Sequence, residues 1–242
     1  MTFTATPKAI PLLASALALA GCGSLIPASN GGPAAGQAAG STSASSRPPA
    51  RVASTPQRVS NRAGDVTCFA ELNAAGASFD ALPDAYSAPG CSTLGTVQLS
   101  ALAGDASRFG ISNIGPVTCR AATTFNGWLR FGVDRAAREI LGSPLARVET
   151  MGSYACRNVA GSERRSAHAR AEAIDVSAFV LENGRRIALA EDWDNGSAAE
   201  REFLRVVHRS ACKRFGTVLG PEYNAAHRDH FHLEESSGQF CR

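Results

Sequence analysis

The stretch Ser166-Ala-His-Ala-Arg-Ala-Glu-Ala-Ile-Asp-Val-Ser-Ala-Phe-Val-Leu181 decides the fold of this 242-residue chain, because it runs from a polar loop into a strand. Residues 173–181 are mainly apolar and include β-branched and aromatic side chains, which predicts a strand. Asn183-Gly184 is a two-residue hairpin signal, and it leads into a further predicted strand at residues 186–190. Residues 147–151 predict another strand before the loop.

Helical patterns surround these strands. Residues 119–141 place apolar side chains at helical spacing and end at Gly142, which suits a helix C-cap. A second helix is predicted from Ser197, which forms a capping box with Glu200, to its end at Gly216.

The remaining segments complete the prediction of fold class. Residues 230–233 predict a last short strand. Residues 66–118 carry only short apolar runs, such as Thr96-Val-Gln-Leu99, broken by Gly and Pro, which indicates loop-rich packing. Mixed strands and helices with a hairpin inside the sheet predict an α+β fold, with a small mixed or antiparallel sheet and flanking helices.

The N-terminal segment indicates export. The apolar stretch at residues 9–20 follows Lys8 and is too short to span a bilayer core of roughly 30 Å, so residues 1–22 are predicted to be a signal peptide. The small residues before Cys22 resemble a bacterial lipobox, which implies a lipid anchor on Cys22. Gly23 resembles the sorting pattern for the outer membrane, which implies its periplasmic face. An ordinary secretory signal with a chance cysteine is the alternative.

Two further regions follow the signal segment. Residues 23–65 are rich in Ser, Ala, Gly and Pro without apolar periodicity, which predicts a flexible tether. Residues 66–242 are long enough for a single domain with its own core. The net charge of +3 comes without a Lys/Arg cluster interleaved with aromatics, so nucleic acid is not an expected partner.

Cysteine usage predicts three disulfides in the domain. The six cysteines after Cys22 are Cys68, Cys91, Cys119, Cys156, Cys212 and Cys241. Six cysteines allow 15 connectivities, and the local pair Cys68–Cys91 is the first expectation. The absence of a CxxC pair argues against a cysteine-ligated zinc site.

Four of the five histidines lie in two patches, one at His168 and one at residues 227–232, and each patch includes a carboxylate. Imidazole and carboxylate are the ligands that hold zinc at catalytic sites. Strand alternation places His230 and His232 on one face, and a loop must turn back to bring His168 to Asp175.

Each of these residues taken alone has an ordinary structural explanation, as a turn carboxylate or a hydrogen-bonded buried histidine. Two imidazoles on one strand face are more informative, because burying them is costly unless something binds them. His208 lies on the amphipathic helix and is predicted to serve packing or the surface.

The pattern Ser166-x-His168-x-x-Ala171-x-Ala173-x-Asp175 resembles the S-x-H-x-x-G-x-A-x-D motif of the LAS zinc metallopeptidases, which include D-alanyl-D-alanine carboxypeptidases. His230-Phe-His232 resembles their H-x-H motif. Over most of residues 66–242 the chain also resembles the bacterial extensin-like C-terminal family. The segments that carry this second likeness are Tyr154-Ala-Cys-Arg157, Leu219-Gly-Pro-Glu-Tyr-Asn224 and His227-Arg-Asp-His-Phe-His232. The resemblance to the metallopeptidases implies a Hedgehog/DD-peptidase-like fold.

The resemblance also implies roles for individual residues. The zinc ligands would be His168, Asp175 and His232. Asp229 would be the general base, His230 would assist at the same intermediate, and Arg157 would bind a substrate carboxylate or an oxyanion. Ser166 and Tyr154 would contact substrate. Ala171 stands in place of the motif's glycine, which matters if the loop requires a positive φ there.

These expectations favour a periplasmic zinc-dependent peptidase that hydrolyses D-amino-acid-containing bonds in peptidoglycan peptides, of carboxypeptidase or endopeptidase type. The alternative is a non-catalytic cell-wall-binding lipoprotein that keeps the metal site for structure. A third interpretation is a disulfide-bonded envelope protein without a metal.

Overall fold

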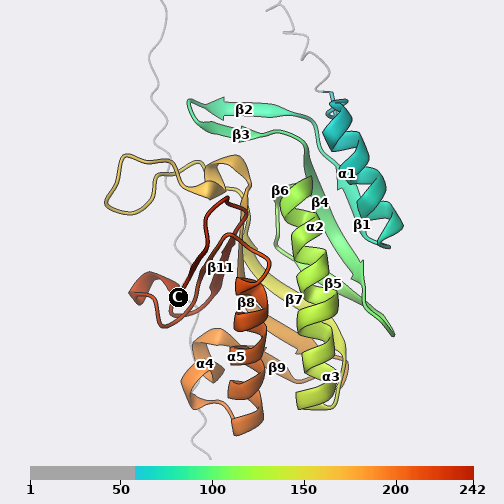
Figure 1. Cartoon of the computed structure of the whole chain (residues 1–242), viewed down its shortest axis with the longest axis vertical. Coiled ribbons are helices and arrows are strands. Elements are labelled where there is room, and N and C mark those ends of the chain that lie inside the picture. The colour runs from blue at the N-terminus through green and yellow to red at the C-terminus, as the bar shows by residue number, and fades with distance from the viewer. Residues whose placement is uncertain (1–57) are drawn as a thin grey trace, which may run out of the picture. The chain divides into compact units, whose positions relative to one another are not determined.

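The computed structural model describes residues 58–242, which form a mixed α+β fold (Figure 1). The expected signal peptide, the lipidation site Cys22 and most of the expected tether lie outside these residues. Among the described residues, no helix combines the length and the apolar character that crossing a bilayer requires. The α+β class expected from the sequence is confirmed.

One ten-stranded sheet forms the centre of the fold, and most of its neighbouring strands are antiparallel. In spatial order the strands are β1 (Ser78–Ala81), β4 (Thr96–Ala103), β5 (Arg108–Ser112), β7 (Leu145–Gly152), β8 (Ala173–Leu181), β11 (Phe231–Glu234), β10 (Thr217–Leu219) and β12 (Phe240–Cys241), with β6 (Pro116–Thr118) beside β4 and β9 (Arg186–Ala188) beside β8. Only the pairs β5–β7 and β10–β12 are parallel. A separate two-stranded hairpin consists of β2 (Ala85–Ala88) and β3 (Cys91–Thr93).

The described residues form five α-helices, some of which begin or end at capping residues. They are α1 (Ala63–Ala74), α2 (Cys119–Trp128), α3 (Arg135–Leu141), α4 (Leu189–Asn195) and α5 (Ala198–Cys212). A π-helical segment at Leu129–Asp134 joins α2 to α3, so the helix predicted over 119–141 is continuous, and Gly142 ends it with a φ of 72°. The capping box of Ser197 and Glu200 is present, and α5 ends at Cys212, before Gly216.

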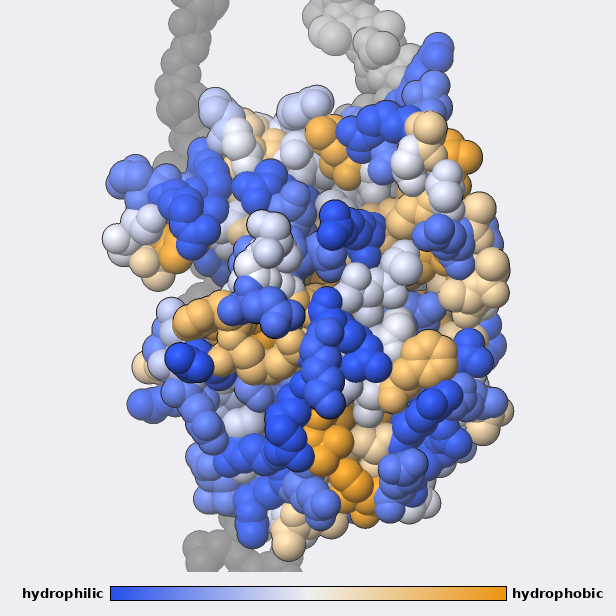
Figure 2. Space-filling view, viewed as in Figure 1, coloured by the Kyte–Doolittle hydropathy of each residue, from blue (hydrophilic) through white to orange (hydrophobic). Residues whose placement is uncertain are grey.

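Helices α2, α3 and α5 pack in front of the sheet in the view of Figure 1. The Trp128 ring is fully buried between them, and its Nε1 donates a hydrogen bond of 3.0 Å to the Val207 carbonyl. Phe179 of β8 meets Trp128 and Phe203 edge to face. The outer surface on this side is mainly hydrophilic with separate hydrophobic patches (Figure 2). The helices therefore bury their apolar stripes against one face of the sheet.

Strand β8 has the predicted bounds. It contains a β-bulge that reverses which face of the sheet the odd-numbered and even-numbered side chains point to. Val176 pairs with Thr150 and Ala178 with Glu149, so Ser177 is an extra residue on β8. A bulge shifts the alternation of side chains by one position. As a result Phe179 lies in the core, whereas Asp175 lies on the face away from Ile174 and Val176.

The expectation of loop-rich packing at residues 66–118 is wrong, because this region contains a helix and six strands. Its longest strand, β4, pairs with β1, β5 and β6. Ordered structure also begins before residue 66, where the tether was expected to end. Helix α1 starts at Ala63, and the buried Ser60 hydroxyl bonds to Asp65.

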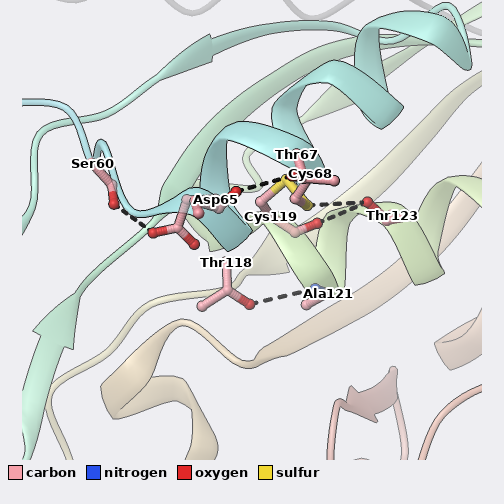
Figure 3. The surroundings of a disulfide bond; sticks show 9 residues. Ser60, Asp65, Thr67, Cys68, Thr118, Cys119, Ala121 and Thr123 are labelled. Atoms are coloured by element: carbon pink, nitrogen blue, oxygen red, sulfur yellow. Dashed lines mark hydrogen bonds between the residues drawn. A yellow bond between two sulfur atoms is a disulfide. The ribbon is translucent and has the colours of Figure 1, made fainter.

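Three disulfides are present, as expected, and they join Cys68 to Cys119, Cys91 to Cys156 and Cys212 to Cys241. The expected local pair Cys68–Cys91 is wrong. Helix α1 packs beside α2, which brings Cys68 to the first residue of α2 (Figure 3). The Thr123 hydroxyl caps the neighbouring Cys119 carbonyl at 3.0 Å.

Candidate metal centre

Two of the expected ligands are direct neighbours across the sheet. Strands β8 and β11 run antiparallel, and their register places His232 opposite Asp175. His232 Nδ1 lies 2.9 Å from Asp175 Oδ1. Phe231 and Leu233, on either side of His232, are fully buried in the core. Alternation therefore directs His232 and Asp175 to the face of the sheet opposite the helices.

The third expected ligand comes from the loop before β8. His168 lies on a 3-10 turn at Ala167–Arg170, whose N-terminus is capped by the Ser166 hydroxyl. Ala171 follows in the left-handed conformation, with φ 56° and ψ 30°, and turns the chain into β8. His168 Nε2 then lies 3.1 Å from His232 Nδ1 and 3.1 Å from Asp175 Oδ2.

Hydrogen bonds on the outer side of the rings decide which imidazole atoms face inward as acceptors. His168 Nδ1 lies 3.2 Å from the Ser153 carbonyl oxygen, which can only accept, so Nδ1 carries the proton. His232 Nε2 lies 3.4 Å from a carboxylate oxygen of Glu234. In neutral rings the inward nitrogens, His168 Nε2 and His232 Nδ1, therefore carry no proton. Each of them directs a lone pair toward the carboxylate of Asp175.

Three converging acceptors repel one another unless a cation lies among them. Burial by itself would raise the pKa of Asp175, but its close contacts with the His168 and His232 rings outweigh burial and hold this pKa well below its usual value. Burial would likewise lower the pKa of His232, yet its bonds to Asp175 and Glu234 raise this pKa to about 9. Without a metal, a proton on His232 supplies the positive charge.

The donor set fits zinc. A tetrahedral zinc with bonds of about 2.0–2.1 Å holds its ligand atoms roughly 3.3 Å apart. One ligand atom from each of the three residues lies within 4.8 Å of the other two. The two imidazole nitrogens are 3.1 Å apart, and each lies 2.9–3.1 Å from a different oxygen of the Asp175 carboxylate. The only other such cluster among the described residues is His208, Cys212 and Cys241, and its two sulfurs are joined in a disulfide.

The three residues lie in or beside an open cavity of about 640 Å³, and Asp175 and His232 are on its wall. The same cavity is also lined by His230, His227, Glu234, Arg157, Arg164 and Ser166. This volume lies in the range of small-molecule and peptide-residue pockets.

His230 and Asp229 differ in their relation to the cavity. His230 lines it, with Nε2 3.7 Å from Asp175 Oδ1 and Nδ1 2.8 Å from Asp229 Oδ1. The Asp229 side chain is 53% exposed and is not part of the cavity wall. His230 therefore faces the cavity and the Asp175 carboxylate, and Asp229 fixes its ring from outside the cavity wall.

Of the three residues expected to contact substrate, two line the cavity and one does not. Arg157 and Ser166 line the cavity. Ser166 additionally accepts a hydrogen bond of 3.4 Å from the His168 backbone, so it supports the ligand turn. Tyr154 does not line the cavity, and its hydroxyl bonds to Ser87 of the β2–β3 hairpin.

Sequence reasoning missed three residues of this site. Glu234 could have been found, because it lies two residues beyond His232 and alternation places it on the same face. Ser153 acts through its backbone carbonyl and has no sequence signal. Arg164 lies on a loop whose path no pattern predicts.

The two remaining histidines differ in role. His208 packs against Trp193 and Phe231 with ring centroids 5.9 and 5.2 Å apart, as predicted for a packing residue. Its pKa is lowered mainly by burial. His227 lines the cavity beside His230, and burial together with the nearby His230 and His232 lowers its pKa to about 4.

Fold and site together define a disulfide-bonded α+β protein with a two-histidine, one-aspartate cluster in an open cavity. A family model described as "Extensin-like protein C-terminus" matches residues 66–242, and the chain belongs to this family. Comparison with curated proteins and with solved structures found no match.

Proposed function

We propose that this protein is a zinc-dependent peptidase that hydrolyses D-amino-acid-containing bonds in peptidoglycan peptides. The observation that carries the proposal is the convergence of three acceptor atoms, from His168, Asp175 and His232, beside an open cavity. Such a set leaves a position free for water, as catalytic zinc sites do. The resemblance of residues 166–175 and 230–232 to the LAS metallopeptidase motifs, and hence to a Hedgehog/DD-peptidase-like fold, supports the same chemistry.

Zinc held by these ligands would supply Lewis acidity toward the scissile carbonyl and toward an attacking water. His230 is positioned to take the proton of that water, because its Nε2 faces the cluster and its Nδ1 is held by Asp229. Arg157 offers a guanidinium on the cavity wall for developing negative charge.

The expected location of the protein in the cell supports this substrate class. Three disulfides are typical of a protein that folds in an oxidising compartment. The lipobox-like segment ending at Cys22 favours a lipoprotein on the periplasmic face of the outer membrane. A domain at this location would lie next to the cell wall.

A second function remains a candidate, namely a non-catalytic cell-wall-binding module. The position of Asp229 favours this binding module. Asp229 stands at the sequence position of the general base in the metallopeptidases that the chain resembles, but it lies outside the cavity wall and would not face a bound substrate. In that case the zinc would stabilise the β8–β11 junction and the cavity would bind peptide without cleaving it.

Metal analysis and muropeptide digestion separate these functions. The purified mature protein is expected to hold about one zinc per chain and to release products from D-amino-acid-containing muropeptides. His168→Ala should lose both zinc and activity, whereas the packing variant His208→Gln should keep both. A fully zinc-loaded protein that cleaves neither muropeptides nor whole sacculi would leave the binding module as the function.

A further inference from the structure

Exposed apolar side chains gather in the cavity beside the candidate metal centre. Among the described residues, seven large hydrophobic side chains are exposed, and three of them, Met151, Tyr223 and Phe240, line this one cavity. Tyr223 is 41% exposed and Phe240 is 43% exposed. Exposed apolar groups that collect in one hollow, with polar groups around them, indicate a surface for a ligand.

Two of these side chains belong to a row of rings that reaches the metal ligands. The Phe240 and Tyr223 rings meet edge to face with centroids 5.8 Å apart, and the Tyr223 and His227 rings do so at 5.4 Å. The His227 ring lies 5.9 Å from the ring of His232. Phe240, Tyr223 and His227, which all line the cavity, form its aromatic wall. This wall therefore extends from the candidate metal centre outward along the cavity.

The backbone around the aromatic wall is held in place. Phe240 lies on β12, and the next residue, Cys241, is joined by a disulfide to Cys212 at the end of α5. Tyr223 N donates a hydrogen bond of 2.9 Å to the Gly220 carbonyl in the turn that precedes it. A surface that is ordered in advance loses less entropy when a ligand binds.

The surroundings of the aromatic wall are polar but uncharged. Among the described residues, the lining side chains from residues 217–226 and from β12 carry no formal charge, and Thr217 and Asn224 contribute a hydroxyl and an amide. Glu222 is 70% exposed and lies outside the cavity wall. The arginines of the cavity come from a different segment, the loop at residues 157–166. The aromatic wall therefore suits a neutral part of a ligand, whereas acidic groups are drawn to that loop.

We infer that the aromatic wall is a subsite for a pyranose ring, so that the preferred substrate is a peptide still attached to its amino sugar. The C–H groups on one face of a pyranose carry a slight positive charge and pack against the negative face of an aromatic ring. Its hydroxyl and acetamido groups can bond to polar side chains such as those of Thr217 and Asn224. The inference rests on the proposed peptidase function and adds the substrate class.

The length of the row of rings fits such a substrate. Tyr223 is separated from the ligand His232 by two ring-to-ring steps of 5.4 and 5.9 Å. An extended peptide covers about 3.3–3.6 Å per residue, so roughly three residues span this distance. A short peptide can therefore place its scissile bond at the metal centre and its sugar on the aromatic wall at the same time.

The test compares a disaccharide-linked muropeptide with the same stem peptide after its sugars have been removed. The zinc-loaded mature protein is expected to show a lower KM for the sugar-bearing substrate. Tyr223→Ala should raise that KM by roughly three- to tenfold and remove the difference between the two substrates, whereas Tyr223→Phe should keep the difference. Tyr86→Ala is the matched control, because Tyr86 is an exposed tyrosine that does not line the cavity.

Replacement by leucine separates ring stacking from simple burial of apolar surface. Tyr223→Leu keeps an apolar side chain without an aromatic face, so it should behave like Tyr223→Ala. Equal KM for the two substrates in the wild type overturns the sugar subsite. A Tyr223→Ala variant that weakens both substrates alike also overturns it, since the wall would then bind peptide, and so does a Tyr223→Leu variant that keeps the full preference.

Calorimetry with the same two ligands keeps the subsite separate from the proposed function. If zinc-loaded protein cleaves neither ligand yet binds the sugar-bearing one more tightly, and Tyr223→Ala removes that difference, the peptidase function fails and the sugar subsite stands. If the two ligands bind equally, the sugar subsite fails whatever the result of the cleavage assay.

Discussion

His232 and Asp175 face each other across neighbouring antiparallel strands, with Nδ1 2.9 Å from Oδ1. Two ligands of the candidate metal centre are therefore positioned by the register of the central sheet, which cannot slip by one residue without exposing Phe231 and Leu233. Only His168 depends on a loop, and that loop is closed by the cap of Ser166. The site is thus built mainly on rigid structure.

Glu234 should tune the affinity for zinc without being a ligand. Its carboxylate accepts from the outer nitrogen of His232, and such partners typically contribute 10–100-fold to metal affinity. We expect Glu234→Gln to bind zinc more weakly by about that factor, as measured by competition with a chelator. Glu235→Gln is the control, since Glu235 pairs with Arg120 away from the cavity. Equal affinities in the two variants would remove Glu234 from the site.

Zinc binding should release protons near neutral pH. In the metal-free protein His232 has a pKa of about 9 and is charged at pH 7, whereas a ligand imidazole must be neutral. Uptake of zinc at pH 7 should therefore displace about one proton from His232, and affinity should rise up to tenfold per unit between pH 7 and 9, then level off. Calorimetry in buffers of different ionisation enthalpy measures the proton count. Uptake of zinc without proton release would contradict this assignment.

His230 should contribute more to turnover than Asp229. A general base typically contributes about 10²–10⁴-fold to rate, so His230→Gln should lose activity by that factor while keeping zinc and fold. Asp229→Ala should lose less, because it only positions the ring, and Asp229→Glu should keep most activity, since the longer acid still reaches Nδ1. The pH profile of kcat/KM should shift in Asp229→Ala. A loss in Asp229→Ala equal to that of His230→Gln, with no such shift, would make Asp229 itself the base.

Ala171→Gly should stabilise the fold. Ala171 is buried in the left-handed conformation, which costs a non-glycine residue roughly 1–2 kcal/mol. Glycine removes that strain but loses about 0.5–1 kcal/mol through the flexibility of the unfolded chain, so the free energy of unfolding should rise by roughly 0.5–1 kcal/mol. Denaturant titration measures the change. Ala169→Gly, a buried alanine on the same turn without a positive φ, should be destabilising by comparison.

The disulfide Cys91–Cys156 should matter for activity as well as for stability. Mature protein should contain no free thiol among the six domain cysteines, and digestion without reductant should recover the three pairs described above. Replacing Cys91 and Cys156 by Ala should cost about 2–5 kcal/mol of stability and loosen the loop that carries Arg157. KM should therefore rise more in this variant than in the double variant of Cys68 and Cys119. Two or more reactive thiols in the native protein would contradict the pairing.

The sequence by itself predicted the elements whose signals are local. The bounds of β8, the continuous helix to Gly142 and the capping box at Ser197 all follow from neighbouring residues, and the structure agrees with each of them. A hairpin is also present at Asn183-Gly184, but Leu181 N donates to the Arg185 carbonyl across a three-residue loop, and the strand after it ends at Ala188, where α4 begins, instead of at residue 190. The choice of His168, Asp175 and His232 came from residue types and a family resemblance, and the structure brings these three together.

Other features depended on the tertiary structure, because they are distances between residues far apart in the chain. Cys68 pairs with Cys119 only because α1 packs on α2, and no spacing rule chooses among 15 connectivities. Apart from β4, the strands of residues 66–118 have three to five residues, and each pairs with a strand that the local pattern does not specify, so they carry little local signal. Likewise, Asp229 and His230 are adjacent in sequence, and only the folded backbone decides that His230 faces the cavity while Asp229 holds it from outside.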